Sequence, residues 1–286
     1  MSSLSHNSVP PPTPPASGRG GITLALSGGT ARGWAHIGAL RVLEEAGIPI
    51  AAVAGTSIGA VAAVALAAGK IDALEQIARD MTRTGMLAHF DLTWARGALL
   101  GGRRIARMLA EQLGAQRFED LDLPAAVVAA DLETGEEVRL SHGPLVSAVQ
   151  ASTAIPGLFP AVVRDGRVLI DGGNVANLPV SAARALAPDR PVLAIDLMGD
   201  YHGHIGAQPA HPRSVPATIR ASYLMLVARQ SEMTIALEKP ELLITMPIGH
   251  ISTGAFHRAA DYIALGREAT LAALPQICAR LEMPKN

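Results

Sequence analysis

Short apolar runs rich in β-branched residues recur along this chain, and between several of them apolar residues recur at helical spacing, as at Ile37, Leu40 and Leu43. Runs of this length and composition are typical of buried strands. They lie at residues 22–26, 50–54, 127–130, 168–170, 192–195 and 242–245. Strands that alternate with helices predict a three-layer α/β/α fold with a mainly parallel central sheet.

Further elements follow from turn and helix signals. Residues 161–163 and 168–170 flank Asp165-Gly166, which predicts a β-hairpin. Helical patterns cover residues 71–83, 103–113, 217–237 and 256–281. The stretch at 217–237 carries Met225, Leu226 and Met233, which suit either a mobile apolar lid or an ordinary packed helix.

The most hydrophobic window covers residues 46–69 and contains no charged side chain. It is long enough to suggest a membrane span. Pro49, Gly55 and Gly59 interrupt it, and its many alanines suit a buried strand, a turn and a helix better than a span.

Composition indicates a globular protein of one main domain at residues 22–286, because 49% of residues are hydrophobic and 17% charged. Residues 1–21 are rich in Ser, Pro and Gly without an apolar core, so we expect a flexible tail and no signal peptide. A net charge of −1 gives no case for nucleic acid. The single Cys278 favours a reducing compartment, so we expect a cytoplasmic protein.

Candidate chemistry begins at Gly55-Thr56-Ser57-Ile58-Gly59, a G-x-S-x-G motif between a predicted strand and an Ala/Val-rich predicted helix. That context is the one a nucleophile elbow needs, with Ser57 exposed on a sharp turn. The motif alone is a weak signal.

A second glycine-bearing loop also joins a strand to a helix, with the sequence Gly28-Gly29-Thr30-Ala31-Arg32-Gly33. Backbone N–H groups at such a helix start favour negative charge. A dinucleotide fingerprint would need Gly at position 30, and a P-loop would need Lys before Ser or Thr. An oxyanion hole needs only convergent N–H donors and is the favoured interpretation, with a tight structural turn as the alternative.

The third segment is Asp171-Gly172-Gly173, directly after the run at 168–170. An Asp before two glycines is usually a turn residue. Its position after a strand, beside the other two motifs in the chain, makes Asp171 a candidate base for Ser57.

The three segments in this order resemble the patatin-like phospholipase family, in particular its bacterial intracellular members. Asn177 and Pro179 after the third segment, residues 35–38, residues 130–135 and residues 151–160 also match. The resemblance is good over residues 22–195 and poor elsewhere.

The resemblance implies a serine lipid acyl hydrolase with a Ser57–Asp171 dyad, acting on phospholipid, lysophospholipid or other fatty-acyl ester, without cofactor or metal, and in transient contact with the inner face of a membrane. Its oxyanion loop would be Gly28, Gly29 and Thr30, with Arg32 at the family's basic position. Thr30 departs from the family's commoner third Gly. Because Thr tolerates positive φ poorly, we expect Thr30 to donate its N–H from a conformation with negative φ.

Two alternatives stay open. An α/β-hydrolase triad needs a later His, and His202, His204, His211, His250 and His257 all follow Asp171. The second alternative is a non-catalytic protein that keeps the fold. His36 is expected to be a packed or capping residue.

Overall fold

The computed structural model describes residues 21–81, 111–112, 114–199, 214–250 and 252–282. The predicted N-terminal tail and most of the helix expected at 103–113 lie outside these residues. So do His202, His204 and His211.

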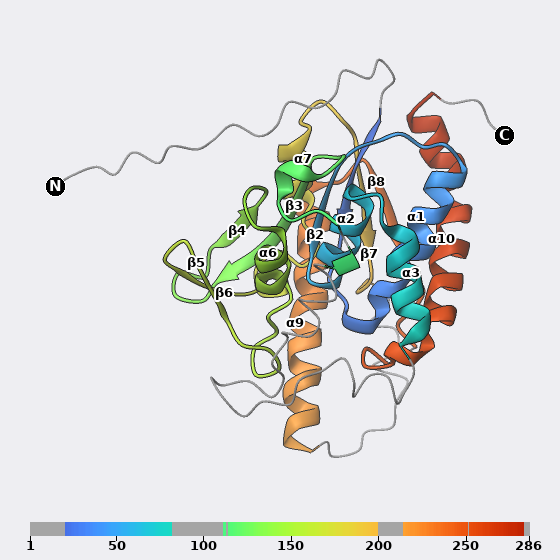
Figure 1. Cartoon of the computed structure of the whole chain (residues 1–286). Coiled ribbons are helices and arrows are strands. Elements are labelled where there is room, and N and C mark those ends of the chain that lie inside the picture. Colours follow the sequence, from blue (N-terminus) through green and yellow to red (C-terminus); the bar gives the residue numbers. More distant parts are fainter. Residues whose placement is uncertain (1–20, 82–110, 113, 200–213, 251, 283–286) are drawn as a thin grey trace.

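An eight-stranded sheet forms the centre of the molecule, in the order β5-β6-β3-β2-β1-β7-β8, with β4 paired to β3. Its strands are β1 Ile22–Leu26, β2 Ile50–Thr56, β3 Ala125–Asp131, β4 Glu137–Leu140, β5 Val162–Arg164, β6 Arg167–Asp171, β7 Val192–Asp196 and β8 Leu242–Thr245. The five strands β3, β2, β1, β7 and β8 are parallel. The prediction of a mainly parallel sheet is therefore confirmed (Figure 1).

The antiparallel part of the sheet is the β5–β6 hairpin together with β4. Asp165 and Gly166 both adopt positive φ, at 50° and 76°, as the predicted two-residue turn requires. Strand β6 is antiparallel both to its hairpin partner β5 and to β3. The other predicted core strands are parallel to one another.

The register of β3 brings the ends of two other strands together. Val128 pairs with both β2 and β4, which must lie on opposite sides of β3. Ala129 pairs with both β4 and β6, so β6 lies on the side that β2 occupies. The carboxyl ends of β2 and β6 consequently approach each other from opposite directions.

Helices cover both faces of the sheet. The elements are η1 Thr30–Gly33, α1 Trp34–Glu45, α2 Ile58–Ala67, α3 Ile71–Asp80, η2 Phe118–Asp120, α6 Leu145–Ser152, η3 Gly172–Asn174, α7 Val180–Leu186, α9 Val215–Glu238, η4 Phe256–Arg258 and α10 Ala259–Arg280. The charge-free window at 46–69 folds as β2, the turn and α2. No helix in the described part of the chain is long and apolar enough to cross a bilayer.

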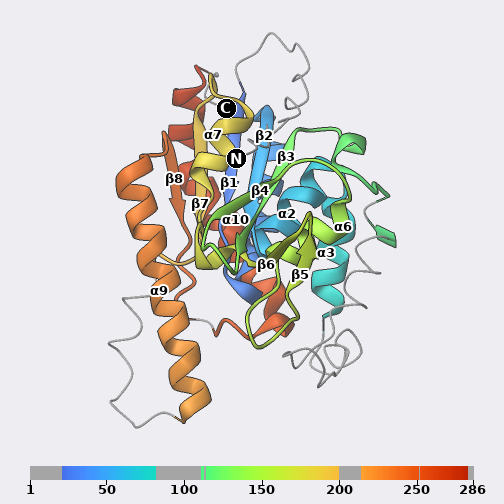
Figure 2. The ribbon, with the colours of Figure 1, turned by 90° about the vertical axis from the view of Figure 1, so that its left-hand side faces the viewer.

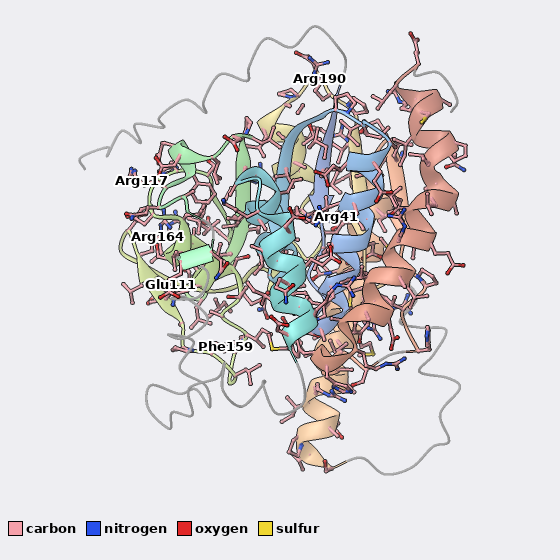
Figure 3. All side chains as sticks on the ribbon, turned by 45° about the vertical axis from the view of Figure 1, so that its right-hand side comes forward. Arg41, Glu111, Arg117, Phe159, Arg164 and Arg190 are labelled. Atoms are coloured by element: carbon pink, nitrogen blue, oxygen red, sulfur yellow. The ribbon has the colours of Figure 1, made fainter. Side chains whose placement is uncertain are left out.

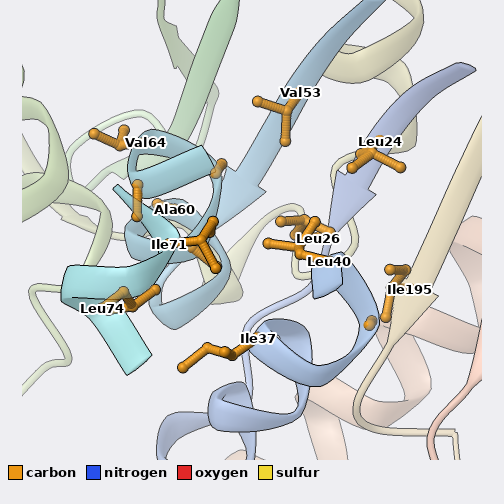
Figure 4. Close-up of a cluster of buried hydrophobic side chains, with 14 of the residues drawn as sticks. Leu24, Leu26, Ile37, Leu40, Val53, Ala60, Val64, Ile71, Leu74 and Ile195 are labelled. Carbon is orange, nitrogen blue, oxygen red and sulfur yellow. The ribbon is translucent and has the colours of Figure 1, made fainter. Parts of the chain in front are cut away.

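The two sheet faces differ in side-chain size. One face carries Leu24, Leu26 and Val53, which pack with α1, α2, α3, α6 and α10 in the larger core (Figure 4). Alanines such as Ala25 and Ala54 dominate the other face, under α7. This alternation follows from the two-residue period of a strand, and the small face lets α7 pack close to the sheet.

A charged contact joins two helices over the larger core. Arg41 of α1 forms ion pairs with Asp72 and Glu75 of α3 (Figure 3). The rest of α3 rests on buried Ile71 and Leu74.

Helix α9 has 24 residues and lies outside the other layers. Its N-terminal half extends beyond the sheet in both Figure 1 and Figure 2. Buried Leu224, Val227 and Ala228 hold its middle against Met198, which follows β7. Leu226 and Met233 are exposed, so the packed-helix alternative does not describe these two side chains.

Candidate active site

Ser57 occupies the turn between β2 and α2 with φ 55° and ψ −124°, the strained conformation of a nucleophile elbow. Close backbone approach explains the glycines on either side. A β-carbon on Gly55 would lie 2.2 Å from the Gly59 carbonyl oxygen, and one on Gly59 would lie 2.2 Å from the Leu26 oxygen. Only glycine fits at either position, so the helix can start directly beside the strand ends.

Asp171 ends β6 and meets Ser57 where β2 ends. The Ser57 hydroxyl donates a hydrogen bond of 2.6 Å to Asp171 Oδ2. The Gly173 N–H donates a bond of 2.7 Å to Asp171 Oδ1. Gly172 lies against the Val128 carbonyl oxygen, which would be 2.2 Å from a β-carbon at this position. The Gly-Gly pair thus brings the carboxylate tightly against the sheet.

Burial controls the charge of this carboxyl group. Asp171 is 1% exposed, and desolvation raises its pKa to about 6, although the bonds from Ser57 and Gly173 favour the ionised form. A carboxylate with a pKa near 6 is a better proton acceptor than an exposed Asp and is still mostly ionised at neutral pH.

Ser152, at the end of α6, supports the elbow from a third element. The Ser57 N–H donates to the Ser152 hydroxyl oxygen at 2.9 Å, and that hydroxyl donates to the Val128 carbonyl oxygen at 2.6 Å. Ser152 lies in a segment that matches the family, but the sequence did not indicate a role for it. The contact joins residues 95 positions apart in the chain, so no local pattern marks it.

The Gly28 to Gly33 loop lies beside Ser57, but its first N–H group already donates a hydrogen bond within the protein. Gly28 donates its N–H to the Asn177 carbonyl oxygen at 3.0 Å. Among the described residues, the N–H groups of Gly29 and Thr30 have no such acceptor. The candidate oxyanion donors therefore narrow to Gly29 and Thr30.

Thr30 adopts φ 53°, so the expectation of a negative φ is wrong. Its hydroxyl lies 2.7 Å from the Gly29 carbonyl oxygen and 2.5 Å from that of Thr253. The Ala31 N–H also donates to Thr253, at 3.0 Å. These contacts offset the strain of a β-branched residue at positive φ.

Arg32 is buried and hydrogen-bonds a segment next to the loop. It is 2% exposed, and its guanidinium donates to the Gly249 carbonyl oxygen at 2.9 Å. Gly33 lies against the Ile58 side chain, where a β-carbon would be 2.2 Å away. Both residues therefore position the loop against its neighbours.

Asn177 links the loop to α9. Its backbone N–H donates to Gln230 Oε1 at 2.7 Å and its side-chain amide to the Ser231 hydroxyl at 2.9 Å. Sequence reasoning noted Asn177 as part of the resemblance and missed both helix partners. Ser231 faces a second buried carboxyl group, Asp196 at the end of β7, whose pKa burial raises.

Tyr223 of α9 also reaches this region. Its hydroxyl lies 3.3 Å from the place a β-carbon on Gly173 would take, and Asp171 Oδ1 lies 3.0 Å from that place. Burial and the charge of Asp171 both raise the pKa of Tyr223. No sequence motif singled out this tyrosine.

Three of the described histidines were considered from the sequence, and none has a hydrogen bond to Ser57 or Asp171 among the described contacts. His36 is buried on α1 with Nε2 2.9 Å from the Ser27 carbonyl oxygen, and burial lowers its pKa to about 4, as expected of a packed residue. His250 and His257 are exposed, whereas Asp171 is buried. In the described ranges, no group of three or more His, Cys, Asp or Glu side chains is placed to hold a metal ion.

The fold is an α/β/α sheet with a serine on a sharp strand-to-helix turn, and comparison with known proteins identifies the family. The family model for patatin-like phospholipase matches residues 24–184. The chain belongs to the patatin-like phospholipase family.

Two groups of relatives illustrate the match. An uncharacterised NTE family protein of Mycobacterium tuberculosis is 36% identical over 182 residues, which is 64% of this chain and 50% of that protein. Mouse patatin-like phospholipase domain-containing protein 6 is 36% identical over 183 residues, or 62% of this chain and 13% of that protein. The chain therefore spans about half the length of this mycobacterial protein and a smaller part of the mouse protein.

Among solved structures, VipD from Legionella pneumophila matches with a TM-score of 0.52 and 15% identity, over 90% of this chain and 67% of that chain. At this identity the likeness shows the fold alone, and it confirms the predicted patatin-like architecture.

Proposed function

We propose that this protein is a serine lipid acyl hydrolase, with residues 22–286 as its catalytic domain, and that it cleaves fatty-acyl esters of phospholipids or lysophospholipids with a Ser57–Asp171 dyad. Family membership supports lipid hydrolysis. The observation that carries the dyad is the 2.6 Å bond from the Ser57 hydroxyl, on its strained elbow, to the buried Asp171 carboxylate.

In the proposed first step, Ser57 Oγ attacks the ester carbonyl carbon while its proton passes to Asp171 Oδ2. The carbonyl oxygen gains the negative charge and accepts hydrogen bonds from the Gly29 and Thr30 N–H groups. One such donor contributes about 3 kcal/mol in comparable sites. The carbon–oxygen ester bond then breaks, and the protonated Asp171 gives its proton to the leaving alkoxide.

Water completes the cycle. Asp171, ionised again, accepts a proton from a water molecule that attacks the acyl-serine carbonyl. When the bond from the acyl carbon to Ser57 Oγ breaks, Asp171 returns that proton to Ser57 Oγ, and the fatty acid leaves. Every step uses side chains and backbone groups already in the site, so the mechanism needs no metal or cofactor.

A triad receives no support from the described histidines, because both that follow Asp171 are exposed.

The single free Cys278 supports a reducing compartment, and we place the enzyme in the cytoplasm on that ground.

The test is hydrolysis of a lysophospholipid, a diacyl phospholipid and the soluble ester p-nitrophenyl butyrate by purified wild-type and Ser57→Ala protein. We expect fatty-acid release from at least one lipid and from the soluble ester, and none above background with Ser57→Ala. Equal rates for the two proteins would contradict the proposal.

A further inference from the structure

The exposed face of α9 carries an apolar stripe, defined here as Val215, Ile219, Leu226, Met233 and Leu237. Each is between 62% and 76% exposed. Their spacings of four, seven, seven and four residues place them within about 40° of one another around the helix. A side chain exposed in this way gains nothing from the protein's own core.

The opposite face of α9 is the one that packs. Leu224, Val227, Ala228 and Ser231 are buried against the body of the protein. The stripe therefore points away from the sheet, and its N-terminal part lies on the half of α9 that extends past it (Figure 2). An exposed apolar patch of this extent marks an interaction surface.

A second copy of this chain fits the stripe poorly. Ile219, Leu226 and Met233 repeat every seven residues, so a coiled coil needs a second apolar position three or four residues further on. The first choice gives Ser222, Arg229 and Ala236, and the second gives Tyr223, Gln230 and Leu237. In the second set, Tyr223 and Gln230 already contact the body of the protein. The stripe has five residues, far fewer than the about 20 to 30 residues that each partner contributes to a standard interface.

Its charge pattern points to a neutral apolar occupant. The stripe contains no ionisable residue. Arg229 and Glu232 border the stripe and form an ion pair with each other at 2.8 Å. Their opposite charges largely cancel at the distance of a partner.

The stripe also adjoins the candidate active site. Tyr223 lies four residues after Ile219 and three before Leu226, and side chains at these spacings are neighbours on a helix. The Tyr223 hydroxyl lies beside Gly173 and the Asp171 carboxylate. Tyr223 therefore connects the edge of the stripe with the surroundings of the dyad.

We propose that the α9 stripe docks this protein on the surface of a neutral lipid layer, with lipid entering the site along Tyr223. The proposal rests on the proposed function for the identity of the substrate, whereas the docking itself can be measured without catalysis.

The experiment compares co-sedimentation with pure phosphatidylcholine vesicles for wild type, for Leu226→Gln/Met233→Gln and for a control with Val163→Gln/Leu271→Gln. The control removes two exposed apolar side chains on β5 and α10, at 76% and 47% exposure, away from α9. We expect the stripe variant to bind vesicles about 10- to 100-fold more weakly, since two apolar side chains lose their burial in lipid. The control should bind like wild type.

Hydrolysis of p-nitrophenyl butyrate serves as the second readout and should stay within about twofold in the stripe variant, because the substituted residues are outside the site. Failure of wild type to cleave this ester would contradict the proposed function alone, and stripe-dependent vesicle binding would still support docking. If Leu226→Gln/Met233→Gln misfolds by circular dichroism, Ile219→Gln/Leu237→Gln replaces it.

Three results would overturn the docking proposal. The first is equal vesicle binding by wild type and the stripe variants. The second is a wild-type dimer in sedimentation equilibrium that the stripe variants dissociate, because the stripe would then be a self-association surface. The third is loss of wild-type binding when salt rises from about 0.05 to 0.5 M, because that would indicate a charged contact.

Discussion

The nucleophile elbow and the oxyanion loop lie side by side, and each contains a non-glycine residue at positive φ, Ser57 at 55° and Thr30 at 53°. They are stabilised in different ways. The elbow is formed mainly by its neighbours in the chain, since β2 leads in, α2 leads out and the Ala60 N–H bonds the Ser57 carbonyl oxygen at 2.9 Å. Two long-range hydrogen bonds add to this, from the Ser57 N–H to Ser152 and from the Ser57 hydroxyl to Asp171.

The oxyanion loop depends on distant segments. Its contacts with Asn177, Gly249 and Thr253 join residues 149, 217 and 223 positions apart in the chain. The turn that carries the nucleophile is therefore specified largely by adjacent sequence, whereas the position of the candidate donors depends on tertiary packing. Substitutions should therefore separate the two.

The largest effect is expected at the dyad. Asp171→Asn removes the base and should lower kcat for ester hydrolysis by about 10⁴-fold. Asp196→Asn is the matched control, because Asp196 is also buried at a strand end with a raised pKa, and it should retain activity within about tenfold. Similar losses in both variants, measured as steady-state rates on one soluble ester, would count against a special role for Asp171.

The next effect tests the loop. Thr30→Val keeps a β-branched side chain at positive φ and removes the hydroxyl that reaches Thr253, so we expect kcat to fall about 10²-fold as the donors shift. Thr30→Gly should stay within about fivefold, because glycine adopts positive φ freely and the Ala31 bond to Thr253 remains. The reverse order of the two rates would show that the hydroxyl contact does not hold the loop.

A smaller loss is expected at the elbow. Ser152→Ala leaves the buried Ser57 N–H without its acceptor and should lower kcat by about tenfold, the equivalent of one hydrogen bond. Ser147→Ala, on the same helix with an exposed hydroxyl contact, should have no effect on the rate. A tenfold loss in both variants would indicate general damage to α6.

A separate effect concerns stability and not the rate, and its sign follows from the pKa of Asp171. Because folding raises this pKa from about 3.8 to about 6, the contribution of Asp171 to the free energy of unfolding is full below about pH 4 and is lost as pH rises through about 6. The loss is on the order of 3 kcal/mol. Asp171→Asn lacks this dependence, so urea midpoints should show the variant gaining stability over wild type between about pH 4 and 7. Parallel pH profiles would contradict a raised pKa.

Patterns within short segments could be read from the sequence. The run at residues 22–26 matches β1, the turn at Asp165-Gly166 matches the observed hairpin, and residues 50–59 match the strand and elbow. In each case the chain's own turn chemistry or strand period determines the structure.

What could not be predicted depends on contacts between distant residues. Nothing near Thr30 indicates that Thr253 would hold it at positive φ, and nothing near Gly28 indicates that Asn177 would take its N–H group. The approach of Tyr223 to Asp171 depends likewise on how α9 packs after the sheet has formed. Sequence reasoning located the two reacting side chains of the proposal and missed most of the residues that surround them.

Reaction of the folded protein with a fluorophosphonate, followed by mass spectrometry to locate the adduct, would show directly whether Ser57 is the nucleophile. The reagent requires an activated serine. The account predicts a single adduct on Ser57 and much slower labelling of Asp171→Asn. An adduct on another residue, or none on wild-type protein shown to be folded, would contradict the claim that Ser57 and Asp171 form the catalytic pair.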